Sequence, residues 1–229
     1  MSSYSTVASV VLAAGSGTRF GNDINKVWLP LKGRHVISRS LTNASAHFKN
    51  SRIILVINPD DEDFARKALA EDAMPTSIEI VYGGASRHES EFNALQHLKS
   101  AIIAGEIETI LIHDGARPLA TPELFSAIAD AAAKHGGAIP TIALDSHEMD
   151  TTRGESVARV QTPQGFKAKP LLEAYEKAEV EGFIGTDTSA CMEKFFPSVK
   201  IRAVPGDVFN FKITYPQDLA IAELLVPLQ

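Results

Sequence analysis

The sequence predicts an α/β protein in which a mostly parallel sheet lies between two layers of helices, forming a three-layer sandwich. Short apolar runs alternate with longer amphipathic segments along the chain, and the runs are continuous in Val, Ile and Leu. Continuous apolar runs are typical of strands buried on both faces, as in parallel sheets covered by helices. Right-handed crossovers between such strands place helices on the sheet, which supports the three-layer arrangement.

The apolar runs give the expected strands. Each is short, rich in β-branched residues and bounded by polar or turn-forming residues, as strands are. They are Val7 to Leu12, Ser51 to Ile57, Ile78 to Tyr82, Thr109 to Ile112, Gly137 to Thr141 and Lys200 to Val204.

The amphipathic segments give the expected helices, because their apolar residues recur with helical periodicity. They are Val36 to Phe48, Asp61 to Ala70, Ser90 to Ala104, Pro122 to His135, Lys169 to Val180 and Thr188 to Phe196. Pro216 and Asp218 indicate a short final helix.

Composition predicts a single cytoplasmic domain spanning residues 1–229, with a polar arm at about 145–160. The 229 residues are 45% hydrophobic and 22% charged, which is enough to bury a large core. The net charge of −6, without a basic block, makes a nucleic-acid partner unexpected. Cys191 is the only cysteine, so no internal disulfide can form. There is no signal-peptide pattern and no apolar run of about 20 residues, so no membrane segment is expected.

The first predicted strand ends in a glycine-rich loop that indicates phosphate binding. Gly15, Gly17 and Gly21 follow the strand, with small residues at positions 13, 14 and 16, and glycine lets backbone amides approach phosphates closely. The spacing matches neither the dinucleotide fingerprint nor the Walker pattern, since position 20 is Phe and no Gly-Lys-Ser/Thr follows. A plain glycine turn is the alternative.

Charged residues at the strand ends suggest phosphate chemistry. Arg19 and Lys26 follow the glycines, where cations could stabilise negative charge on a triphosphate, although solvated surface charges are the alternative. Asp114 ends an apolar strand and is the candidate Mg²⁺ ligand, with Arg117 available to hold a phosphate. A structural Asp turn with an Arg pair is the alternative there. We expect the neighbouring His113 to be structural.

Two later segments also contain candidate functional or structural residues. Lys212 lies in an apolar setting, where a lysine usually has an anionic partner such as a phosphate. Thr186 or Asp187 is a natural N-cap for the helix that follows.

Together these motifs resemble the cytidylyltransferases of methylerythritol phosphate and ribitol phosphate, in order and over nearly the whole chain. The resemblance rests on Ala13 to Arg19 with Lys26, Gly83-Gly84 with Arg87 and Ser90, His113 to Pro118, Thr162-Pro163-Gln164, Thr186-Asp187 and Phe211 to Thr214. It implies a Rossmann-like nucleotidyltransferase sheet, a homodimer, and Mg²⁺-dependent transfer of CMP from CTP to a small polyol phosphate.

The resemblance also implies roles for individual residues. Catalytic roles fall to Arg19, Lys26 and Lys212. Nucleotide binding falls to Ala13, Ala14, Gly15, Ser16, Gly17, Gly84, Arg87 and Ser90. Acceptor binding falls to Asp114, Arg117, Ser146 and Lys212, with Asp114 also near the metal.

The chain departs from the family pattern at its arm, which is short. Ser146 stands where the family usually has Thr, and Arg153 and Arg159 are the candidates for an arginine that the arm supplies to the neighbouring subunit. Asn25 precedes Lys26, where proline is usual.

The sequence is compatible with several functions. The first loop and the residues around Thr162 favour methylerythritol phosphate as acceptor, whereas the residues before Lys212 look closer to the ribitol phosphate enzymes. A sugar-1-phosphate or molybdopterin nucleotidyltransferase shares the first loop. A nucleotide-binding regulator without catalysis is the non-enzymatic alternative.

Overall fold

The computed structural model describes residues 6–15, 24–48, 51–143 and 158–226. Its strands are β1 (Val7–Leu12), β2 (Pro30–Leu31), β3 (Arg34–His35), β4 (Arg52–Ile57), β5 (Ile78–Tyr82), β6 (Thr109–Asp114), β7 (Gly136–Ala143), β8 (Ala158–Val160), β9 (Gln164–Lys167) and β10 (Lys200–Pro205). Its α-helices are α1 (Val36–Ser45), α2 (Glu62–Glu71), α3 (Arg87–Ala104), α4 (Pro122–His135), α5 (Ala168–Glu181), α6 (Thr188–Phe195) and α7 (Pro216–Leu225).

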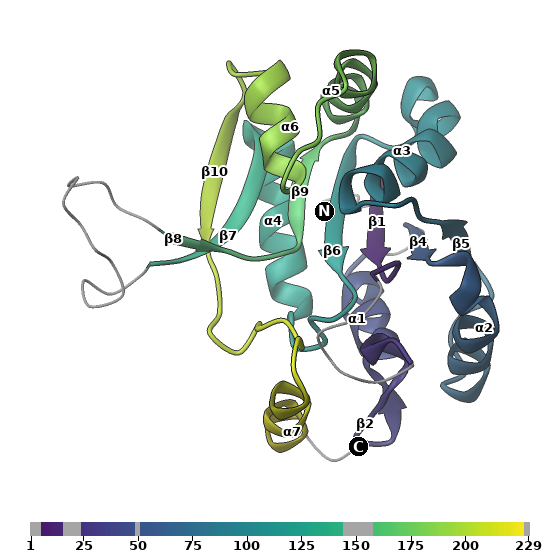
Figure 1. Cartoon of the computed structure of the whole chain (residues 1–229). Helices are drawn as coiled ribbons and strands as arrows, with labels where there is room; N and C mark the ends of the chain where they lie inside the picture. Colours follow the sequence, from purple (N-terminus) through teal and green to yellow (C-terminus); the bar gives the residue numbers. More distant parts are fainter. Residues whose placement is uncertain (1–5, 16–23, 49–50, 144–157, 227–229) are drawn as a thin grey trace.

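The main sheet runs in the order β10-β7-β9-β6-β1-β4-β5, with β8 paired to β7 (Figure 1). The pairs β1–β4, β1–β6, β4–β5 and β7–β10 are parallel, whereas β9 is antiparallel to both β6 and β7. The mostly parallel sheet predicted from the apolar runs is therefore confirmed.

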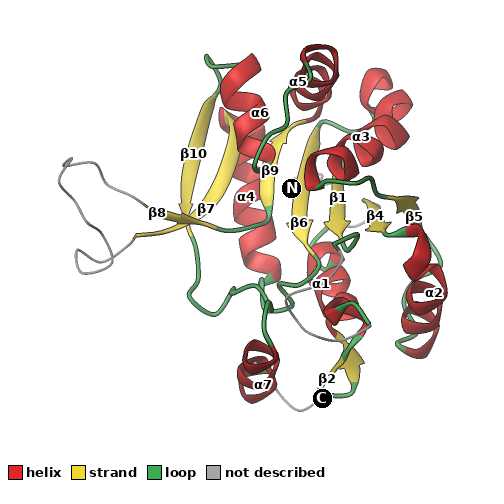
Figure 2. Cartoon of the chain, in the orientation of Figure 1, coloured by secondary structure: helices red, strands yellow, loops and turns green. Residues whose placement is uncertain are grey.

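Helices cover both faces of this sheet (Figure 2). On one face, Val11 and Leu55 of the sheet belong to the same buried cluster as residues of α1, α2 and α4. On the other face, Val10 and Val56 belong to a cluster with residues of α3, α5 and α6. Neighbouring residues of one strand thus enter opposite cores, which explains why the strands read as continuous apolar runs.

The predicted element types hold, with small shifts at their ends. Helix α3 begins at Arg87 rather than at Ser90, because the Ser86 side chain caps it by accepting the Glu89 N–H at 3.0 Å. The final helix after Pro216 and the Asp187 cap of α6 are confirmed. None of the helices in the described ranges is long and apolar enough to cross a membrane.

Two short features differ from the prediction. The sequence predicted no strand between Thr141 and Lys200, but Gln164–Lys167 forms β9, which pairs with both β6 and β7. The residues between Trp28 and Val36 form a hairpin of β2 and β3, whose connection has positive φ at Lys32 and Gly33. The predicted arm lies largely outside the described residues, with only its last part seen as β8.

Candidate active site

A pocket of about 410 Å³ lies at the carboxyl ends of β1, β5 and β6. Ligands of open α/β sheets bind at this edge. The predicted site residues that line it are Ala13, Ala14, Gly15, Lys26, Gly84, Arg87, Ser90, Asp114 and Lys212. Ser16, Gly17, Arg19, Ser146 and Arg153 lie outside the described residues.

The wall between β1 and β5 requires glycine at position 83. A Cβ atom there would lie 2.5 Å from the Ala14 Cβ and 2.7 Å from the Ser90 Oγ, both too close. The Ser90 hydroxyl accepts the Gly84 N–H at 3.1 Å and donates to the Ser86 carbonyl at 2.8 Å. Ser90 therefore shapes the loop after β5 in addition to lining the pocket.

Asn25 holds the loop after β1, a role that the sequence did not reveal. Its Nδ2 donates to the carbonyl of Ala13 at 2.9 Å and to that of Gly15 at 2.6 Å. Asn25 also caps the short 3-10 helix Lys26–Trp28 by accepting the Val27 N–H at 3.4 Å. One side chain thus links the glycine loop to Lys26. In the sequence, only the position of Asn25 beside Lys26 indicated this role.

Asp114 lies at the centre of a cluster of positive charges. Its Oδ1 is bonded to the Arg87 Nη1, and its Oδ2 lies 3.1 Å from the Lys212 Nζ and 3.5 Å from the Arg117 Nε. The Asp114 side chain is only 8% exposed. Burial alone would raise the pKa of Asp114, but Arg87, Lys212 and Arg117 lower that pKa well below its ordinary value. The carboxylate is therefore ionised at neutral pH.

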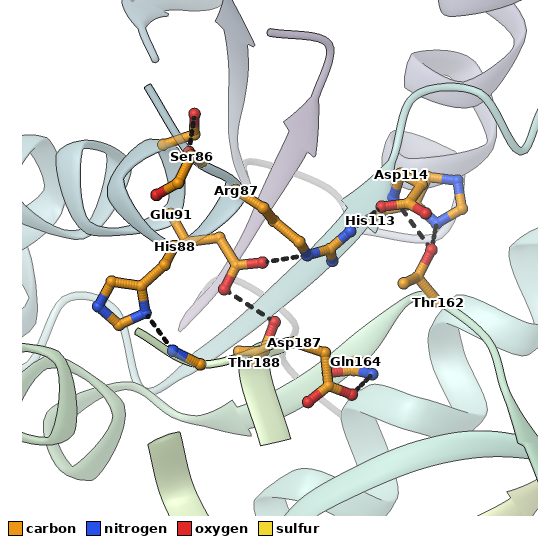
Figure 3. Close-up of polar contacts among 12 residues, drawn as sticks. Ser86, Arg87, His88, Glu91, His113, Asp114, Thr162, Gln164, Asp187 and Thr188 are labelled. Carbon is orange, nitrogen blue, oxygen red and sulfur yellow. Dashed lines mark hydrogen bonds and ion pairs between the residues drawn. The ribbon is translucent and has the colours of Figure 1, made fainter. Parts of the chain in front are cut away.

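Thr162 and His113 fix Asp114 from behind. The Asp114 N–H donates to the Thr162 Oγ1 at 3.0 Å, and that hydroxyl lies 3.1 Å from the His113 Nδ1 (Figure 3). The His113 Nε2 lies 3.2 Å from the Arg117 carbonyl, which can only accept a hydrogen bond. The proton of neutral His113 is therefore on Nε2, and Nδ1 accepts from Thr162. Burial lowers the pKa of His113 to about 4, consistent with the structural role expected for it.

The loop that carries Lys212 is tied to the centre of the sheet. The Gln161 Nε2 donates to the carbonyls of Asp207 and Asn210, at 2.8 and 3.1 Å, and the Asn210 Nδ2 donates to the Thr162 carbonyl at 2.9 Å. The Lys212 side chain is 37% exposed, so its ammonium group reaches both Asp114 and solvent. Lys212 is therefore held at the pocket by the residues that also position Asp114.

Arg117 contacts Asp114 but is absent from the described lining of the pocket. Its Nη1 donates to the Asn210 carbonyl at 2.7 Å, and its side chain is 14% exposed. This geometry agrees with the structural alternative for Arg117, which braces Asp114 and the Lys212 loop from behind. Arg159, in β8, is exposed and is not among the described residues that line the pocket.

Sequence reasoning missed other residues of the pocket. Asn58 follows β4 and lines the pocket, so it could have been found by the same strand-end rule that identified Asp114. Glu91 does not line the pocket but is bonded to Arg87, and no motif marked it.

A pocket with glycine-rich walls at the carboxyl edge of a mostly parallel sheet is typical of α/β proteins that bind nucleotides. Comparison with known proteins gives the particular class. Residues 7–227 match the family model described as "IspD: 2-C-methyl-D-erythritol 4-phosphate cytidylyltransferase", and the chain belongs to this family. Its members are cytidylyltransferases, a type of nucleotidyltransferase.

Individual relatives are similar to this chain over nearly their full length. The chain is 36% identical to the 2-C-methyl-D-erythritol 4-phosphate cytidylyltransferase of Cereibacter sphaeroides, covering 97% of this chain and 98% of that protein. It is 35% identical to the protein of the same name from Geobacillus kaustophilus, covering 95% and 96%. The solved 4-diphosphocytidyl-2C-methyl-D-erythritol synthase of Anaerococcus prevotii superposes with a TM-score of 0.78 at 30% identity, covering 97% of this chain and 96% of that one.

Proposed function

We propose that this protein transfers CMP from CTP to the phosphate of 2-C-methyl-D-erythritol 4-phosphate and releases pyrophosphate, a step of isoprenoid precursor synthesis. The observation that carries the proposal is that Asp114, at the end of β6, and Lys212 meet in one pocket with the glycine-rich loops after β1 and β5. Family membership over residues 7–227 supports it.

In the proposed reaction, an oxygen of the acceptor phosphate attacks the α-phosphorus of CTP. The new P–O bond forms as the bond between the α-phosphorus and the bridging oxygen breaks, and pyrophosphate leaves with that electron pair. The nucleophile is already anionic, so no general base is required and catalysis rests on positioning and charge stabilisation.

The residues divide this work according to their place in the pocket. Lys26, together with Arg19, stabilises charge on the α-phosphate, while the walls around Ala14 and Gly84 contact the base and ribose. Lys212 holds the acceptor phosphate, and Arg117 adds positive charge from behind.

The proposed reaction also includes Mg²⁺, which would be held by Asp114 and would neutralise charge on the triphosphate. In the described residues no group of three or more His, Cys, Asp or Glu could hold a metal ion. The Asp114 Oδ1 has one cation contact, with Arg87, so a lone pair of this oxygen would be available to a metal. Asp114 thus fits an ion whose other ligands are phosphate oxygens and water, as is usual for Mg²⁺ with nucleotides.

The wider proposal is one nucleotidyltransferase domain over residues 1–229, acting in the cytoplasm as a homodimer. The continuous sheet built from both halves of the chain supports a single domain. In this proposal Ser146 binds the acceptor, and Arg153 or Arg159 of the arm at about 145–160 is the arginine supplied to the neighbouring subunit.

Pyrophosphate release tests the proposed function. The reaction contains Mg²⁺ and CTP with methylerythritol phosphate, ribitol 5-phosphate or no acceptor, and ATP, GTP and UTP serve as controls. We expect release with CTP and methylerythritol phosphate only. Release with ribitol 5-phosphate would assign the other acceptor, another preferred nucleotide would indicate a sugar-1-phosphate type of enzyme, and CTP binding without release would indicate a regulator.

A further inference from the structure

Glu91 is a buried carboxylate directly behind the pocket. It lies on α3 one turn after Arg87, and its side chain is 1% exposed. The Arg87 Nε donates to its Oε1 at 2.7 Å. The hydroxyls of Tyr175, on α5, and Thr188, on α6, both donate to its Oε2, the latter at 3.1 Å. Glu91 is therefore fixed by contacts from three helices.

Arg87 joins this carboxylate to the pocket. Figure 3 shows its side chain extending from α3, with Glu91 on one side and the end of β6 that carries Asp114 on the other. The Nε atom is bonded to Glu91 and Nη1 to Asp114. Burial alone would lower the pKa of Arg87, but the charges of Asp114 and Glu91 raise it, so the guanidinium remains charged.

One donor of Arg87 is left over. Its Nη2 is buried and has no hydrogen-bond partner among the residues that the structure describes, while the side chain as a whole lines the pocket. A buried donor without an acceptor costs free energy, and a bound ligand with an acceptor would remove that cost. With two of its nitrogens fixed by carboxylates, Arg87 cannot turn to satisfy the third by itself.

We propose that Glu91 is a positioning residue that fixes the Arg87 guanidinium, so that Nη1 holds Asp114 while Nη2 remains available to an acceptor atom of the bound nucleotide. Glu91 touches no reacting atom and acts through Arg87. That the bound nucleotide is CTP rests on the proposed function. That Glu91 fixes Arg87 does not depend on the proposed function.

The variant Glu91→Gln tests this role because it keeps the size of the side chain and replaces one of the two acceptor oxygens with an NH2 group, which can only donate. Glu176→Gln is the matched control, since Glu176 lies on α5 and pairs with Lys99 outside the pocket. Tyr175→Phe provides a second probe that removes one donor to Glu91 and keeps the ring stacked on His88.

The first readout is the NMR signal of the Arg87 Nε–H, which does not require activity. We expect a slowly exchanging signal in the wild type and in Glu176→Gln, its loss in Glu91→Gln and faster exchange in Tyr175→Phe. The second readout is CTP affinity by calorimetry, which we expect to fall about tenfold or more in Glu91→Gln and less in Tyr175→Phe. In turnover, the KM for CTP should rise more than the KM for the acceptor.

The outcomes separate the two proposals. If the Arg87 Nε–H signal is unchanged in Glu91→Gln, the positioning role is wrong. The role is also wrong if this signal is lost in Glu91→Gln while CTP affinity stays the same. If Glu91→Gln does not fold, a wild-type signal and wild-type CTP affinity in Tyr175→Phe overturn it. If the wild type releases no pyrophosphate, the proposed function is wrong. If the variants then still lose CTP affinity, the role of Glu91 is supported all the same.

Discussion

Replacing Asp114 by Asn should destabilise the protein strongly, because three cations share its charge. Lys212 is the most exposed of them, so its side chain can turn to solvent at a loss of no more than about 1 kcal/mol. Arg87 keeps Glu91 as a partner. Arg117 is mostly buried, and Asp114 is its only ion-pair partner among the described residues. An uncompensated buried charge costs about 3–5 kcal/mol, so we expect a loss of this size at pH 7.

The effect should depend on pH in a defined direction. The folded-state pKa of Asp114 lies well below the value of about 3.9 for an unfolded chain. The stability that Asp114 contributes is therefore complete above about pH 4 and declines below it by about 1.4 kcal/mol per pH unit. The difference between wild type and Asp114→Asn should be full at pH 7 and smaller at pH 3.5.

Urea unfolding followed by the fluorescence of Trp28, the only tryptophan, measures this difference. Asp63→Asn, at an exposed position in the first turn of α2, is the matched control and should lower the free energy of unfolding by no more than about 1 kcal/mol, the contribution of a charge at a helix N-terminus. If Asp114→Asn loses less than about 1 kcal/mol at pH 7, or an equal amount at both pH values, the account of the charge cluster is wrong.

Three further predictions concern the pocket and its support. Lys26→Ala should lower kcat by about 10²- to 10³-fold with little change in the free energy of unfolding, and a wild-type rate in steady-state assays would remove Lys26 from the mechanism. Gly83→Ala should weaken CTP binding, because its Cβ would lie 2.5 Å from the Ala14 Cβ, and unchanged affinity by calorimetry would refute this. Since burial lowers the pKa of His113 to about 4, its contribution to stability should be lost as the pH falls from about 6.5. His113→Gln should flatten that part of the pH profile of urea unfolding, and an unchanged slope would contradict the assignment.

Much of the fold could be predicted because parallel strands and amphipathic helices leave strong local patterns. The strand β5 and the helix α4 were predicted with the bounds that the structure shows. β9 was missed because Gln164-Gly165-Phe166 has little intrinsic strand preference and pairs only in the context of β6 and β7. The start of α3 was missed because the Ser86 cap was not recognised.

The site could be predicted where its residues follow strands, since the topology brings strand ends together. Asp114 is the last residue of β6 and Gly84 follows β5, and both line the pocket. The support behind them could not be predicted, because it depends on contacts that are distant in sequence. Tyr175 and Glu91, for example, are separated by 84 positions and meet only through the packing of α5 on α3.

The most direct test of the central claim is a competition for limiting CTP between equal concentrations of methylerythritol phosphate and ribitol 5-phosphate, with Mg²⁺ and product analysis by mass spectrometry. The account predicts one cytidylylated product, 4-diphosphocytidyl-2-C-methylerythritol, formed with an equal amount of pyrophosphate. A ribitol adduct as the main product, or consumption of CTP without any adduct, would contradict it.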